Sequence, residues 1–151
     1  MRDRHDRGMD RGHRAVPHTA DVRIEAWAPE REGCLAEAVA ALVETFADTT
    51  DATPDGETTV GLPAGDDTGL LVGLLDEVIF RLETEGTLPL VTEAQTVDGG
   101  LRVRWRTVDA DAVELVGAVE LVGAVPKAVS LHGLRFGRDD TGWSCVVTVD
   151  V

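Results

Sequence analysis

The side chains best able to do chemistry stand near the two ends of the chain. In the stretch VPHTADVRIEAWAP, His18 and Asp21 come directly before a strand-like run. At the other end, VVTVDV places Asp150 next to Val151 and its free carboxylate, so two anionic groups are adjacent by covalent structure. If these two segments are neighbouring strands, Asp21 adds a third carboxylate. Three such oxygen donors suit Ca²⁺, Mg²⁺ or Mn²⁺, whereas solvated ends of two strands are the alternative.

The common signatures of catalysis are absent from the sequence. There is no GxGxxG or Walker-type phosphate loop, no HExxH, no CxxC and no EF-hand loop. Serine occurs only at positions 130 and 144, so a serine triad would need a chance assembly. Nucleophilic catalysis is therefore not expected.

The formal net charge of −14 limits the possible partners. Non-specific affinity for nucleic acid comes from Lys and Arg that displace counterions from phosphates. An acidic surface repels phosphate backbones instead. We expect no strong direct nucleic-acid binding, and any role in RNA biology to be indirect.

The first 15 residues are expected to form a disordered tail. The segment MRDRHDRGMDRGHR holds five Arg against three Asp and has no apolar periodicity. Its His5 and His13 are expected to be solvated rather than metal-binding. A short basic arm that touches nucleic acid or an acidic partner is the alternative. Residues 16–151 would then form the folded domain.

The chain of 151 residues, 43% hydrophobic and 28% charged, fits one soluble domain with a real core. No apolar run approaches the ~20 residues of a membrane span, and the N-terminal segment is unlike a signal peptide, so a cytoplasmic protein is expected. Cys34 and Cys145 are expected to be buried and reduced, with a disulfide or a redox pair as alternatives.

Hydrophobic spacing predicts the elements that position these residues. Alternation in TADVRIEAWA predicts a strand. Helical spacing predicts one helix over about 31–47 and a second with Asp67 or Thr68 as its N-cap and Gly86 as its C-terminal stop. The segment ETTVGLP between the helices is compatible with a short strand.

Four strands in two hairpins follow the second helix. The first hairpin is predicted to turn at Asp98-Gly99-Gly100, where glycine accepts positive φ, and the second to turn over 137–142. This order predicts a single α+β domain, with an antiparallel or mixed β-sheet and two helices packed on one face. Between the hairpins, residues 113–124 repeat the unit VELVGA, which is expected to lengthen a loop or helix without altering the sheet, with a functional insert as the alternative.

Several of these segments together resemble the archease family. They are HTADVRIEAWA with the Ala-rich helix after it, DEVIFRLETEG, PKAVSLHGLRF and the closing GWSCVVTVDV. The likeness runs from about residue 17 to the last residue. It covers nearly all of the expected folded part.

The resemblance implies a protein cofactor of an RtcB-type RNA ligase, which joins RNA ends, as in tRNA splicing, with GTP and Mn²⁺. In that family the protein accelerates guanylylation of the ligase and allows multiple turnover, but makes no bond itself. The family's metal ligands carry over onto Asp21, Asp150 and the terminal carboxylate of Val151, and its functional lysine onto Lys127. His18 would support Asp21, or would be a capped, partly buried imidazole.

The chain departs from the family pattern in three places. Pro17 replaces the acidic residue usual before His-Thr-Ala-Asp, and Ser130 stands where threonine is usual. The VELVGA repeat lies just before Lys127, the only lysine, and would alter its approach or loop out. His132 is expected to be structural. The three tryptophans are expected to pack against the sheet rather than to bind bases.

Two other classes of function compete with ligase activation. The same carboxylates with a bound water would suit a metal-dependent phosphoester hydrolase, although no general acid or substrate pocket is evident. A chaperone-like interaction module would bind partners without a cation. Removing the cation with a chelator would impair the activator but not such a module.

Overall fold

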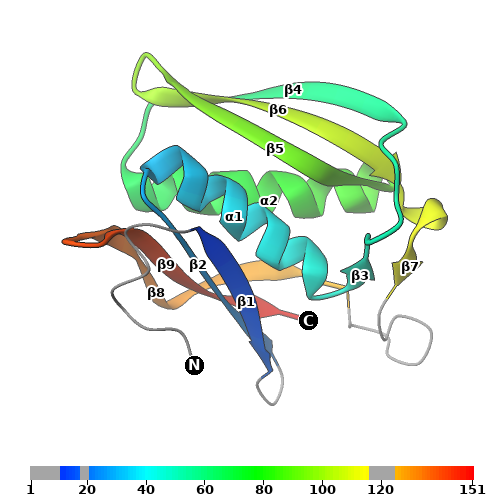
Figure 1. Ribbon diagram of the computed structural model, residues 1–151, viewed down its shortest axis with the longest axis horizontal. Helices are drawn as coiled ribbons and strands as arrows, with labels where there is room; N and C mark the ends of the chain where they lie inside the picture. Colours follow the sequence, from blue (N-terminus) through cyan, green and yellow to red (C-terminus); the bar gives the residue numbers. More distant parts are fainter. Residues whose placement is uncertain (1–10, 18–20, 116–124) are drawn as a thin grey trace.

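The computed structural model describes residues 11–17, 21–115 and 125–151, and Figure 1 shows its two helices between two antiparallel sheets. Within the described residues, one sheet has four strands in the order β1-β2-β9-β8 and another has three in the order β4-β6-β5. The four-stranded sheet comprises β1 (Gly12–Pro17), β2 (Asp21–Ala28), β9 (Gly142–Asp150) and β8 (Ala128–Asp139). The three-stranded sheet comprises β4 (Gly56–Leu62), β6 (Gly100–Asp109) and β5 (Thr87–Val97), while β3 (Ala47–Asp48) pairs with β7 (Glu114–Leu115). The predicted α+β class is confirmed, with the helices covering one face of each larger sheet.

The two helices begin and end where local chemistry satisfies their backbone groups. Helix α1 spans Arg31–Glu44 and helix α2 spans Asp67–Glu85. The Asp66 carboxylate caps α2 by accepting a 2.7 Å hydrogen bond from the Gly69 N–H, so the cap lies one residue before the earlier of the two predicted positions. Gly86 ends the helix as predicted, with a left-handed φ of 67°.

The core fills the space between the layers. Helix α1 buries Leu35, Val39 and Leu42, and α2 buries Leu71, Leu74, Leu75 and Val78. The four-stranded sheet contributes Ile24, Val147 and Val149 from the face toward the helices, and the three-stranded sheet contributes Val103 and Trp105. Since this core holds the middle of β2 and β9 in fixed register, it also fixes where their ends lie.

Both predicted hairpins are present. Asp98 (φ 52°) and Gly99 (φ 79°) turn β5 into β6, as expected for a tight hairpin with two positive φ angles. The second hairpin joins β8 to β9, but its turn is shorter than the predicted 137–142, because the strands pair as far as Asp139 and Gly142.

The predicted disordered tail is wrong for residues 12–15. These residues belong to β1, which pairs antiparallel with β2 from Gly12↔Trp27 to Pro17↔Val22. His13 is not solvated as expected, since its ring contacts carboxylates of Glu37 and Glu44 on α1. Residues 1–10, including His5, lie outside the described part of the chain.

Cys34 and Cys145 are buried free thiols, which agrees with the sequence-based expectation. Hydrogen bonding with the Cys145 thiol, together with burial, raises the pKa of Cys34 far above its ordinary value, so the thiol stays protonated. No helix in the described ranges is long and apolar enough to cross a membrane. Residues 116–124, most of the VELVGA repeat, are not described.

Candidate functional site

Asp21 and Asp150 lie directly opposite each other at one end of the four-stranded sheet. The register pairs Asp21 of β2 with Asp150 of β9. Side chains of directly opposed residues lie on the same face of a sheet, with Cβ atoms roughly 4.5–5.5 Å apart. This face points away from the helices, because the alternate residues Val22 and Val149 pack toward the core. The predicted juxtaposition of the two carboxylates is therefore present.

Lys127 and Val151 lie at the same end of the sheet. The Lys127 N–H donates a 2.8 Å hydrogen bond to the main-chain oxygen of Asp150, and the next residue, Ala128, pairs with Asp150 on the side of β9 opposite to Asp21. The Lys127 side chain is exposed, and it forms no ion pair with the residues that the structure describes. The main chain of Lys127 is thus held at Asp150, next to the aspartate pair.

A hard cation at this end of the sheet would need a main-chain oxygen as a ligand in addition to side-chain carboxylates. Across residues 11–17, 21–115 and 125–151, no three His, Cys, Asp or Glu side chains gather in a group that could hold a metal ion. Asp21 and Asp150 supply two side-chain carboxylates, and a main-chain oxygen of Val151 would be the third donor. Oxygen ligands of this kind suit Ca²⁺, Mg²⁺ and Mn²⁺ and disfavour soft metals.

His18 lies outside the described residues, so its support of Asp21 stays a prediction. The segment that it shares with residues 19 and 20 joins β1 to β2. Since Pro17 ends β1 and Asp21 begins β2, the HTAD motif spans the connection between these two antiparallel strands.

Beside the aspartates, the outer face of the four-stranded sheet carries a hollow that the sequence did not predict. It encloses about 510 Å³ and is lined by Asp21, Arg23, His132, Gly133, Leu134, Arg135, Val146 and Thr148. We call this the outer hollow. The exposed His132 and Asp21 both line it, and the expectation that His132 is structural stays a prediction.

An irregularity in β8 forms one wall of the outer hollow. Ser130 pairs with Thr148 and Arg135 pairs with Val146, so four residues of β8 oppose one residue of β9. Ser130 Oγ accepts a hydrogen bond of 3.2 Å from the His132 N–H, and Gly133 adopts a φ of 70°. The signal in the sequence was the Ser-x-His-Gly spacing, whose hydroxyl and glycine both favour a local turn.

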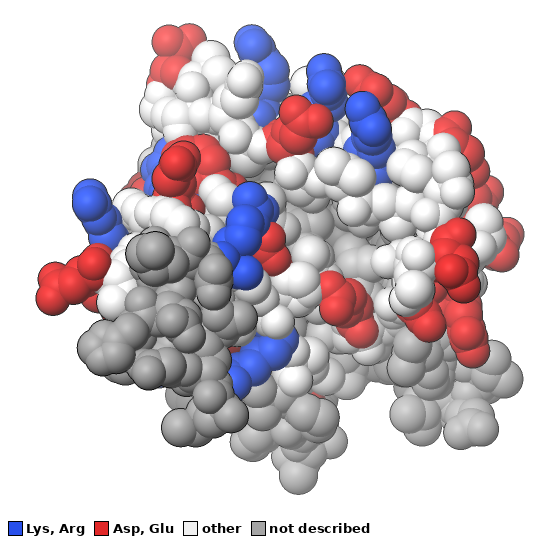
Figure 2. Space-filling view, in the orientation of Figure 1, with Lys and Arg blue, Asp and Glu red and all other residues white. Residues whose placement is uncertain are grey.

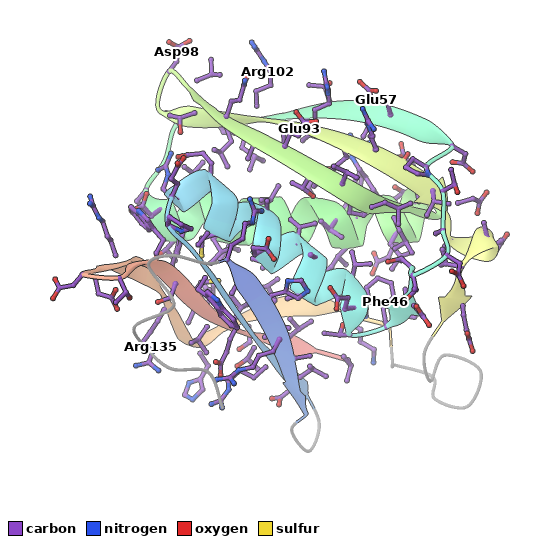
Figure 3. All side chains as sticks on the ribbon, in the orientation of Figure 1. Phe46, Glu57, Glu93, Asp98, Arg102 and Arg135 are labelled. Carbon is purple, nitrogen blue, oxygen red and sulfur yellow. The ribbon has the colours of Figure 1, made fainter. Side chains whose placement is uncertain are left out.

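The arginines around the outer hollow differ in how closely they approach a carboxylate. Glu25 accepts two hydrogen bonds from Arg14, at 3.0 and 2.8 Å, whereas its nearest approach to Arg23 is 3.9 Å. Arg135 is exposed and has no carboxylate partner in the described part of the chain. Figure 3 shows its side chain pointing away from the helices, on the side of the molecule opposite to Arg102.

Comparisons with known proteins agree with the fold and with the sequence motifs. The model of the Archease protein family (MTH1598/TM1083) matches residues 13–151. The chain is 48% identical over 144 residues to the "Probable protein archease" of Mycobacterium tuberculosis (strain CDC 1551 / Oshkosh), a match that covers 95% of this chain and 77% of that protein. It is 30% identical over 142 residues to the "Protein archease" of Methanopyrus kandleri, covering 90% of this chain and 96% of that protein.

A solved structure has the same fold. The solution structure of Methanobacterium thermoautotrophicum protein 1598 superposes with a TM-score of 0.67 at 24% identity, covering 93% of this chain and 99% of that one. The family model extends from β1 to the last residue and so includes Asp21, Lys127 and Asp150. The chain therefore belongs to the archease protein family.

Proposed function

We propose that this protein is a non-catalytic activator of an RtcB-type RNA ligase and acts in the cytoplasm in tRNA splicing or RNA repair. The observation that carries the proposal is the meeting of Asp21, Asp150 and Lys127 at one end of the four-stranded sheet. These are the positions to which the family resemblance assigns the metal ligands and the functional lysine. Asp21 lies 106 positions from Lys127 and 129 from Asp150 in the sequence, and their meeting at one end of the sheet favours a shared role.

The two aspartates are proposed to hold a divalent cation, Ca²⁺, Mg²⁺ or Mn²⁺, together with a main-chain oxygen of Val151. Like charges directly opposite on a sheet repel each other, and a cation removes that repulsion. When bound, the cation would offer a Lewis-acidic charge to a phosphate at the nucleotide pocket of the partner. The chain's own contribution is to hold the two carboxylates in register on the rigid strands β2 and β9.

Lys127 and the neighbouring bulge are proposed to face the ligase. A compact ammonium group can offset phosphate charge on the guanylylated ligase or pair with a carboxylate of the partner. Leu131, in the bulge of β8, is 69% exposed, which is unusual for a large apolar side chain of this protein. An exposed leucine, and an exposed lysine without an ion-pair partner among the described residues, on and next to the same strand are typical of a contact surface for another protein.

The proposal is tested by multiple-turnover RNA ligation with the cognate RtcB-type ligase, GTP and Mn²⁺. The rate is measured without this protein, with wild type, and with Asp21→Ala or Lys127→Ala. We expect wild type to stimulate turnover, and each substitution to remove at least 90% of the stimulation, because neither side chain belongs to the core. Circular dichroism checks that both variants are folded.

Arg102→Ala is the matched control for Lys127→Ala. Arg102 is an exposed cation on β6, on the outer face of the other sheet, and forms no ion pair with any described residue (Figure 3). The Arg102→Ala substitution should leave the stimulation of RNA ligation unchanged. Full stimulation by the folded Lys127→Ala variant, or hydrolysis of GTP by this protein without the ligase, would refute the proposal.

A further inference from the structure

The outer hollow gathers hydrogen-bond donors that neither the metal site nor the family resemblance uses. Arg23 enters it from β2, Arg135 from β8, His132 from the bulge of β8, and Thr148 from the strand between them. All four lie on the face away from the helices. Strands next but one in a sheet are about 9.6 Å apart, so two arginines can reach a group between them from opposite sides.

We propose that the outer hollow binds a phosphate group. Two guanidinium groups, an imidazole and a hydroxyl are the donors that recognise tetrahedral oxyanions, and arginine does so through paired N–H groups. Arg135 is the strongest member, because it is exposed and unpaired among the described residues. Arg23 is second, since Arg14 already satisfies Glu25 with two hydrogen bonds.

The shape of the hollow follows from small side chains on the central strand. The outward residues of β9 are Ser144, Val146 and Thr148, which alternate with the buried Cys145, Val147 and Val149. Short side chains in the centre and long arginines on both flanks leave a depression. A second depression of about 740 Å³ continues it along β9 and shares Arg23, Leu134, Arg135 and Val146, so there is room for a nucleotide as well as for its phosphate. Its lining also includes Arg138 and the carboxylates of Glu25 and Asp139, so the phosphate itself is assigned to the outer hollow.

Local charge distinguishes this surface from the rest of an acidic molecule. Figure 2 shows acidic and basic groups interspersed over the visible face, whereas the lining of the outer hollow has two arginines, Arg23 of β2 and Arg135 of β8, and one carboxylate. The one carboxylate in its lining is Asp21, at the end shared with the proposed cation site. A cation held there would offset that charge and favour an anion beside it.

Direct binding to the isolated protein tests the proposal. Isothermal titration at constant ionic strength, with and without Mg²⁺, uses three probes: orthophosphate, GMP, and a short RNA with a 3′-phosphate compared with the same RNA ending in a 3′-hydroxyl. The choice of the last two rests on the proposed function. We expect saturable binding of at least one phosphate-bearing probe, weakened about tenfold by Arg135→Ala and less by Arg135→Lys, which keeps the charge.

Arg102→Ala is again the matched control, because it removes the same charge from an exposed strand position on the other sheet. Preference for GMP identifies a nucleotide as the source of the phosphate, and preference for the 3′-phosphorylated RNA identifies an RNA end. No binding at millimolar probe, or equal weakening by Arg135→Ala and Arg102→Ala, would overturn the phosphate site. Neither result depends on ligase activation, so failure here leaves the proposed function standing.

Discussion

At the scale of single residues, Asp21 and Asp150 form a cross-strand pair of like charges, which by itself does not stabilise the fold. Cross-strand carboxylates on one face repel each other, and hydrophobic or oppositely charged pairs are better tolerated. Asp150 is exposed and Asp21 is half-buried, so solvent screens part of the repulsion. The cost is small, and the proposed cation would remove it.

Replacing one aspartate should therefore raise the stability of the metal-free protein. Asp150→Asn removes the like-charge contact without changing side-chain size. We expect the free energy of unfolding in EDTA to rise by about 0.5 kcal/mol or less, because the pair is partly exposed. Urea denaturation at pH 7 measures it. The control is Asp140→Asn in the β8–β9 turn, an acid at the opposite end of β9, which should give no gain from this contact.

Asp150→Asn and Asp140→Asn also test whether the aspartate pair binds a cation. Millimolar Ca²⁺ or Mn²⁺ should raise the melting temperature of wild type and of Asp140→Asn, since a ligand that binds only the folded state stabilises it. Asp150→Asn should lose most of that increase. An equal increase in all three proteins would argue against a cation at the aspartate pair.

At the scale of elements, strand β1 is held to helix α1 by ionisable groups. His13 Nδ1 lies 2.6 Å from Glu37 Oε1, its Nε2 contacts Glu44, and Arg11 also binds Glu37, at 2.5 Å. With a carboxylate at each ring nitrogen, both nitrogens act as donors, as in the imidazolium. The hydrogen bond to Glu37 raises the pKa of His13, despite the opposing effect of burial, and the same bond lowers the pKa of Glu37.

These shifts predict how stability depends on pH. Because folding raises the pKa of His13, the protonated ring stabilises the folded state. This stabilisation is complete below the pKa of the unfolded chain, 6.5, and is lost as pH rises through the pKa of the folded protein. Because folding lowers the pKa of Glu37, its carboxylate stabilises the folded state at neutral pH. This stabilisation is lost in acid, as pH falls through the pKa of Glu37 in the folded protein. We expect wild type to lose up to about 1 kcal/mol relative to His13→Gln between pH 6 and pH 9.

Urea denaturation across that range measures the difference. The matched control is His132→Gln, because the His132 ring is exposed and makes no hydrogen bond with any described residue. Its profile should follow that of wild type. Parallel pH profiles for wild type and His13→Gln would show that His13 does not anchor β1.

Local patterns predicted most elements but not how they assemble. Apolar periodicity and capping residues located both helices, β2 and the two hairpins, because these signals lie within a few residues of each other. Strand β1 was missed, since its polar sequence is stabilised by Glu37 and Glu44, which lie 24 and 31 residues from His13. The division of the strands into two sheets was also missed, because sheet order depends on tertiary packing.

The candidate site was predictable only in part for the same reason. The carboxylates of Asp21 and Asp150 were identified from their places at strand ends, on the condition that β2 and β9 are neighbours, and that condition is met. The outer hollow was not predictable. It depends on four residues of β8 opposing one of β9, and on arginines contributed by two separate strands.

At the scale of the whole molecule, the acidic chain concentrates its candidate chemistry on the outer face of one sheet. The aspartate pair, Lys127 and the outer hollow all belong to strands β2, β9 and β8 or to residues beside them. Figure 1 shows the end of β9 and the start of β8 at the same end of this sheet. The helices and the three-stranded sheet form a rigid support behind it, with the central strand β9 fixed by buried valines.

Activation of the partner ligase is proposed to depend on the aspartate pair. The most direct measurement is the rate at which the RtcB-type ligase acquires covalently bound GMP from radiolabelled GTP in Mn²⁺, with wild type, Asp150→Asn or Asp140→Asn added. We expect acceleration by wild type and by Asp140→Asn, and none by Asp150→Asn. Equal acceleration by Asp150→Asn and wild type would contradict it.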